Sequence, residues 1–149
     1  MKRAILLVED NPADEKLTLR AFRKSEVPVE VVVVRDGAEA LDWLLGRGPH
    51  AGRDPSLLPA VVLLDLKMPR IDGLEVLRRI RSDERTRSVP VVVLTASREE
   101  KDVLDSYSIG ANAYVQKPVE FAEFVETTRT IGRFWVEINV PAPARRSPE

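Results

Sequence analysis

The chain has no cysteine among its 149 residues and contains a single histidine. The missing thiols exclude disulfides and thiolate metal sites. No apolar run approaches the ~18 residues that a membrane-spanning helix needs. Met1-Lys2-Arg3 leads directly into a short apolar run and lacks the cleavage pattern of a signal peptide. We therefore expect a cytoplasmic protein that does not associate with membranes.

An excess of charge of either sign is also missing. Lysine and arginine total 23, aspartate and glutamate total 24, and the formal net charge is -1. Because no segment concentrates a basic stripe, we expect no nucleic-acid partner. The length and the 44% hydrophobic content predict one globular domain over residues 1–140. Residues 141–149 are rich in proline, alanine and arginine, so we expect a disordered tail and no separate output domain.

Strand-like and helix-like patterns alternate five times along the chain, which predicts an α/β fold with a parallel sheet. Asparagine, aspartate or serine precedes four of the helix-like segments at positions typical of an N-cap: Asn11, Asp36, Asp72 and Ser97. The expected strands cover residues 4–8, 30–34, 61–64, 89–94 and 113–116. The expected helices cover residues 12–25, 37–45, 73–82, 97–110 and the segment after Pro118, and a long loop covers residues 46–59.

Asp65 is the most informative residue. It follows Val61-Val62-Leu63-Leu64, and an apolar run without alternation predicts a strand buried on both faces. Open α/β sheets bind ligands at the carboxyl ends of such strands. Three further strand ends carry polar side chains, namely Glu9 and Asp10, Thr95, and Lys117. Carboxylates, a hydroxyl and an ammonium on one sheet edge predict a site for a divalent metal and a phosphoryl group.

Taken in order, these strand ends resemble the motifs of response-regulator receiver domains. The shared features are the acidic pair, Asp65 with Met68-Pro69, Thr95 and Lys117-Pro118, and the resemblance covers about Ala4 to Trp135. It implies a flavodoxin-like, doubly wound five-stranded parallel sheet of strand order 2-1-3-4-5, with five helices. It also implies a stand-alone two-component response regulator that takes a phosphoryl group from a sensor histidine kinase. Such a protein is not an enzyme for a separate substrate, and it signals by docking or by phosphorelay.

The resemblance assigns roles to individual residues. Asp65 is the nucleophile that becomes phosphorylated. A Mg²⁺ ion relieves the repulsion among the carboxylates, with Asp10 and Asp65 as direct ligands. The Lys67 backbone carbonyl supplies a third ligand, and Glu9 acts through a metal-bound water.

The remaining roles concern reading of the phosphoryl group. The resemblance implies that Lys117 contacts a phosphoryl oxygen, aimed by a cis bond before Pro118. Thr95 donates its hydroxyl to the same group. Tyr114 matches the switch aromatic, which turns inward as Thr95 moves.

A narrower resemblance concerns the short response regulators that partner bacterial phytochrome kinases. It rests on Asn11-Pro12-Ala13-Asp14, the loop at 46–59, Ser106-Tyr107 and the Phe134-Trp135 end, and it suggests a phytochrome-type sensor kinase. Apolar residues exceed one core-facing stripe on the last two helices, and exposed aromatic patches mark interfaces. We expect a homodimer through Val103, Tyr107, Phe124, Phe134 and Trp135.

Three other functions compete with this interpretation. A phosphatase with an aspartate nucleophile carries a second aspartate two residues later, where this chain has Lys67. A flavodoxin-like cofactor binder needs a phosphate loop rich in serine, threonine or glycine after the first strand, where Glu9 and Asp10 repel a phosphate. A receiver that has lost phosphorylation would lack some of the key residues, and all of them are present.

Overall fold

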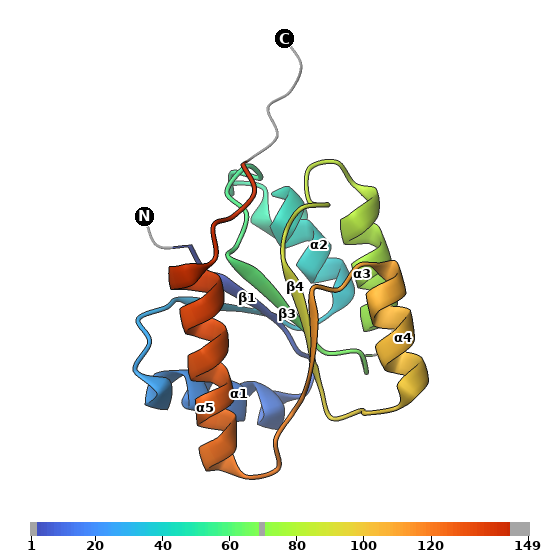
Figure 1. Cartoon of the computed structure of the whole chain (residues 1–149). Coiled ribbons are helices and arrows are strands. Elements are labelled where there is room, and N and C mark those ends of the chain that lie inside the picture. The colour runs from blue at the N-terminus through green and yellow to red at the C-terminus, as the bar shows by residue number, and fades with distance from the viewer. Residues whose placement is uncertain (1–2, 69–70, 144–149) are drawn as a thin grey trace.

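The structure is a computed structural model that describes residues 3–68 and 71–143. A single sheet of five parallel strands forms its centre, in the order β2-β1-β3-β4-β5 (Figure 1). This confirms the predicted flavodoxin-like topology. The strands are β1 (Ile5–Val8), β2 (Val31–Val34), β3 (Val61–Leu64), β4 (Val91–Thr95) and β5 (Ala113–Gln116). Pro69 and residues 144–149, which belong to the predicted motif and the predicted tail, lie outside the described residues.

Helices cover both faces of the sheet. Helices α1 and α5 pack on one face, and α2, α3 and α4 lie on the other (Figure 1). Their bounds are α1 (Pro12–Ser25), α2 (Gly37–Leu45), α3 (Gly73–Ser82), α4 (Glu100–Ile109) and α5 (Phe121–Gly132). A short 3₁₀-helix, Gly48–His50, lies within the predicted long loop. Among the described residues, no helix is long and apolar enough to cross a membrane.

The buried strands explain why their sequences do not alternate. Successive side chains of a strand point to opposite faces. Ile5 and Leu7 enter the core under α1 and α5, whereas Leu6 and Val8 enter the core under α2 and α3. Trp43 is buried in the second of these cores. Apolar residues are therefore needed on both faces, and the polar side chains follow where each strand ends.

Caps define most helix starts as predicted. The Asn11 side chain accepts from the backbone N–H groups of Ala13 and Asp14, and Asp36 and Asp72 cap α2 and α3 in the same way. The predicted start of α4 is two residues early. The structure gives Glu99 as the N-cap, without a side-chain cap bond among the described residues. The Ser97 hydroxyl donates to the Asp102 carboxylate at 2.6 Å and accepts from the Glu99 backbone N–H at 3.3 Å.

The chain continues past α5 without a break. Arg133–Ile138 forms a π-helical stretch that contains the aromatic pair Phe134 and Trp135. Their rings meet edge to face, with centroids 4.8 Å apart. Trp135 packs against the core, whereas Phe134 is 43% exposed.

Arg81, near the end of α3, ties together the sheet edge opposite Asp65. Its guanidinium donates to the carbonyls of Gly110 at 2.9 Å and Val89 at 2.7 Å. It also donates to the Asn112 side chain at 2.9 Å. The ends of α3 and α4 are thus joined to the segments that enter β4 and β5.

Candidate functional site

Strand register brings the predicted residues together. Val8 is aligned with Leu64, so Glu9 and Asp65 are the next residues on neighbouring strands. Thr95 is aligned with Gln116, so Lys117 follows directly beside it. All of these side chains line one cavity of about 260 Å³, together with Asp10, Asn11, Asp14, Lys67 and Ala96. The sheet edge therefore collects the carboxylates, the hydroxyl and the ammonium that the sequence predicts there.

The two carboxylate oxygens of Asp65 have different partners. Oδ1 accepts from the Lys67 backbone N–H at 3.1 Å and from the Thr95 hydroxyl at 3.1 Å. Oδ2 lies 3.3 Å from Nζ of Lys117. The carboxylate is thus held in place through one oxygen, and the other oxygen lies beside a cation.

Glu9 and Lys117 form the most buried charge pair of the site. Glu9 is 1% exposed, and its Oε1 lies 2.6 Å from Nζ of Lys117. Burial raises the pKa of Glu9 to about 7, although the hydrogen bond from Lys117 acts in the opposite direction. Burial acts to lower the pKa of Lys117, but the bond to Glu9 and the charges of Asp65, Glu9 and Asp14 outweigh it and raise that pKa overall. Lys117 therefore stays a cation at neutral pH.

Three carboxylates of the cavity fit a divalent metal. Glu9, Asp10 and Asp65 each offer one oxygen, and these oxygens lie within 4.8 Å of one another. Oxygen donors of this kind suit Mg²⁺, which binds through a few carboxylates and keeps several waters. Lys67, the predicted source of a carbonyl ligand, also lines the cavity. The cavity thus offers oxygen donors that could hold a divalent metal.

The expectation of a cis peptide bond before Pro118 is wrong, because no cis peptide bond occurs among the described residues. Lys117 enters the cavity without one. Its backbone N–H donates to the Thr95 carbonyl at 2.7 Å, which continues the pairing of β4 with β5 by one residue. This pairing fixes the backbone of Lys117 beside Thr95.

Tyr114 connects the site to α4 through residues that the sequence did not indicate. Its hydroxyl donates to the Ser97 carbonyl at 2.8 Å, and the Ser97 hydroxyl donates to Asp102 Oδ2 at 2.6 Å. The same Asp102 oxygen lies 3.6 Å from Nζ of Lys67. No spacing in the sequence links these residues, because the contacts depend on how α4 lies over two loops.

The predicted interface residues are not all at the surface. Tyr107 is 51% exposed, Phe134 is exposed, and Val103 and Trp135 are partly buried. Phe124 is only 2% exposed and packs in the core under α5. Its inclusion in the interface was therefore wrong, because a core side chain has no area to offer a second copy.

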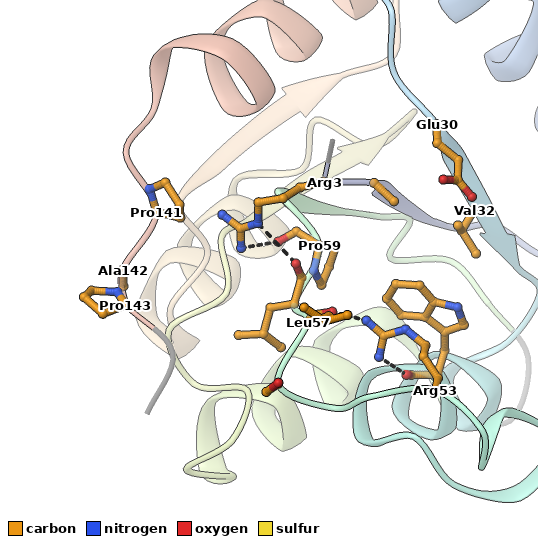
Figure 2. A pocket seen from close by; sticks show the side chains of 13 residues that line it. Arg3, Glu30, Val32, Arg53, Leu57, Pro59, Pro141, Ala142 and Pro143 are labelled. Atoms are coloured by element: carbon orange, nitrogen blue, oxygen red, sulfur yellow. Dashed lines mark hydrogen bonds between the residues drawn. The ribbon is translucent and has the colours of Figure 1, made fainter. Parts of the chain in front are cut away.

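A larger cavity lies at the opposite edge of the sheet, far from Asp65. Figure 2 shows Arg3 donating to the carbonyls of Leu58 and Pro59, and Arg53 donating to the carbonyl of Leu57. The two arginines thus hold three consecutive carbonyls of the segment that enters β3. This cavity, of about 540 Å³, is mainly apolar and contains no group of the candidate site.

The fold and the residues of the site are those of a receiver domain, and comparison of the sequence with protein families identifies the same class independently. The response regulator receiver domain matches residues 5–129, and the chain belongs to that family. Two curated relatives match nearly the whole chain. The probable methanogenesis regulatory protein FilR2 of Methanothrix harundinacea is 43% identical over 94% of this chain and 88% of its own length. The response regulator Rcp1 of Synechocystis is 36% identical over 94% of each chain.

Solved structures of similar proteins agree with this fold. The phosphorylated cyanobacterial phytochrome response regulator RcpA has a TM-score of 0.85 at 39% identity and covers 95% of this chain and 99% of its own. The Mn²⁺-bound form of Rcp1 has a TM-score of 0.82 at 34% identity, over 94% and 99%. The bacteriophytochrome response regulator RtBRR has a TM-score of 0.77 at 52% identity, over 96% and 86%.

Proposed function

We propose that Asp65 accepts a phosphoryl group from a phosphohistidine of a sensor histidine kinase. The observation that carries this proposal is the pair of environments around its carboxylate: one oxygen is held by Lys67 and Thr95, and the other lies in the cavity beside Lys117. A carboxylate that is fixed in place and lines a cavity is well placed to act as a nucleophile. The similarity to the phosphorylated RcpA supports the same chemistry.

The transfer exchanges one bond to phosphorus for another. An Asp65 oxygen attacks the phosphorus, the bond from phosphorus to the imidazole nitrogen breaks, and the histidine leaves as imidazole after taking a proton. Lys117 Nζ lies 3.3 Å from Asp65 Oδ2, and its ammonium would stabilise a phosphoryl oxygen; positioning and charge stabilisation are the main contributions of a protein to this reaction. The Thr95 hydroxyl donates to Asp65, and the same hydroxyl would turn to donate to the new phosphoryl group.

We further propose that the transfer depends on Mg²⁺. Asp10 and Asp65 would hold the ion directly, with the Lys67 carbonyl, and Glu9 would act through a water. When bound, the ion neutralises the carboxylates and the phosphoryl oxygens. The Mn²⁺-bound structure of Rcp1 supports a divalent metal in this family.

The kinase we propose is of the phytochrome type and works in the cytoplasm. The bacteriophytochrome and cyanobacterial phytochrome regulators among the similar structures support this partner. The receiver then signals by docking to a further protein or by passing its phosphoryl group onward. A homodimer through α4, β5 and the end of α5 is also part of the proposal, and the exposed Tyr107 and Phe134 support it.

The test is incubation with a small phosphodonor and Mg²⁺, followed by intact-mass measurement. Wild type should gain the mass of one phosphoryl group, and Asp65→Asn should gain none. Asp105→Asn, which makes the same change outside the cavity on α4, is the matched control and should behave as wild type. A wild type without the mass gain, or an Asp65→Asn variant with it, refutes the assignment.

A further inference from the structure

A closed ring of contacts passes through the proposed nucleophile, Asp65, and through the first turn of α4. Asp65 Oδ1 accepts from Thr95, whose Oγ1 in turn accepts from the Ser97 N–H at 3.5 Å. The Ser97 hydroxyl donates to Asp102, and Asp102 pairs with Lys67. The Lys67 N–H closes the ring by donating to Asp65 Oδ1. Two loops and one helix are therefore linked to the same carboxylate oxygen.

We propose that the Lys67–Asp102 ion pair is a latch that holds the resting state, which makes Lys67 and Asp102 positioning residues for phosphorylation of Asp65. This regulation rests on the proposed function, since it concerns the same site. In the resting protein, Lys67 holds Asp102, and Asp102 holds Ser97. When the latch opens, Ser97 and the first turn of α4 lose one of their anchors.

Electrostatics explains why phosphorylation opens the latch. A phosphoryl group carries about -1.5 to -2 charges near neutral pH. It would form on Asp65, two residues from Lys67, and compete with the single charge of Asp102 for the Lys67 ammonium. The Lys67 side chain is 65% exposed and can turn freely, whereas Asp102 is largely covered on α4. The lysine therefore moves toward the new charge, and Asp102 loses a partner.

Tyr114 reports the state of the latch. Its hydroxyl donates to the Ser97 carbonyl, and the Ser97 hydroxyl is held by Asp102. Burial raises the pKa of the Tyr114 phenol, and the charges of Asp102 and Lys67 act on it in opposite directions. A change in the Lys67–Asp102 ion pair should therefore alter both the hydrogen bond of Tyr114 to Ser97 and the electrostatic environment of its phenol.

The first measurement needs no phosphodonor. Amide spectra of the resting protein should show the signals of Ser97 and Tyr114 displaced in the same direction by Asp102→Asn and by Lys67→Ala, because each variant opens the ring. Glu100→Gln removes a carboxylate from the same first turn of α4, and Lys101→Ala removes a nearby exposed cation. Both controls should leave these two signals in place. Signals that do not move in Asp102→Asn, or that move equally in the controls, overturn the latch.

The second measurement is the rate of phosphorylation by a small phosphodonor with Mg²⁺. Asp102→Asn should be phosphorylated roughly two- to five-fold faster, the range expected for one exposed ion pair. Lys67→Ala should be no faster than wild type, because it loses the cation along with the latch. In the double variant, Asp102→Asn should add nothing to Lys67→Ala, since coupled residues are not additive. Equal gains with and without Lys67 overturn the inference.

The two proposals fail in different ways. If wild type gains no phosphoryl group, the proposed function is wrong, while the resting spectra still decide whether the ring exists. If wild type is phosphorylated but Asp102→Asn reacts at the rate of Glu100→Gln, the function stands and the latch is wrong.

Discussion

Lys117 Nζ lies 2.6 Å from Oε1 of Glu9, although 108 positions separate the two residues along the chain. One residue follows β1 and the other follows β5, so the bond reaches across the ends of β3 and β4. Removing one partner of a buried pair leaves an uncompensated charge, which costs about 3–5 kcal/mol. This pair therefore joins the ends of β1 and β5 at the cavity and stabilises that edge of the sheet.

The buried Glu9 carboxyl should make the stability of the metal-free protein depend on pH. The folded pKa of about 7 lies above the ordinary value of 4.5, so the folded state binds the proton more tightly than the unfolded chain. The stabilisation is complete below pH 4.5 and is lost as the pH rises through about 7. Glu9→Gln should reduce the pH-dependent change in the free energy of unfolding by up to about 3 kcal/mol. Denaturant unfolding at several pH values measures it, with the exposed Glu123→Gln as control. A Glu9→Gln variant with the wild-type pH slope would contradict this prediction.

Asp10→Ala should weaken Mg²⁺ binding by about ten-fold or more, because even outer-shell changes reach that size. Asp10 is one of three carboxylates whose oxygens lie close together, and the other two cannot replace its oxygen. Titration calorimetry measures the affinity, and Glu123→Gln is again the control for a lost surface charge. Equal Mg²⁺ affinity in Asp10→Ala and wild type would remove Asp10 from the metal site.

Gly73→Ala should destabilise the protein and disturb the nucleophile. A Cβ at Gly73 would lie 2.4 Å from the Asp65 carbonyl oxygen and 2.6 Å from Cα of Leu66, and backbone cannot yield as a flexible side chain does. Overpacking of this kind costs about 1–3 kcal/mol. Gly52→Ala is the matched control, since no described atom lies within 4 Å of its Cβ. Thermal unfolding of both variants decides the point, and equal midpoints would refute the close approach.

The proposed homodimer should depend on exposed aromatic side chains. Tyr107→Ala combined with Phe134→Ala should weaken self-association by at least about ten-fold, because buried aromatics dominate interface energies. Leu17→Ala removes an exposed apolar side chain from α1, which is not one of the proposed interface elements, and should leave association unchanged. Sedimentation at micromolar concentration measures both. A monomeric wild type, or a double variant as dimeric as wild type, excludes this interface.

Local patterns in the sequence were sufficient to predict most of the fold. Asp36 and Asp72 cap their helices, and the apolar runs form the five strands in the expected order. Helix α4 begins two residues later than the pattern at Ser97 predicts. The Ser97 hydroxyl accepts from the Glu99 N–H and also donates to Asp102 on α4, and a capping pattern cannot reveal this second contact. The π-helical stretch after α5 and the burial of Phe124 were missed for a related reason, since both depend on how α5 packs against the sheet.

The site was predictable in composition but not in its connections. Parallel strands place their carboxyl ends at one edge, so Glu9, Asp65 and Lys117 could be expected to meet. The pairing of Asp102 with Lys67 could not, because it arises from the placement of α4 over a loop that follows another strand.

The guanidinium of Arg81 gives α4 one fixed end. It bonds the carbonyl of Gly110, the C-cap of α4, along with the segments that lead into β4 and β5. The opposite end of the helix begins at Glu99 and is connected to Asp65 through Ser97, Thr95 and the Lys67–Asp102 ion pair. Helix α4 is therefore anchored at its C-terminal end, at Gly110. We expect a displacement of the first turn of α4 to tilt the helix about its Gly110 end, so that the residues beside the cavity move furthest.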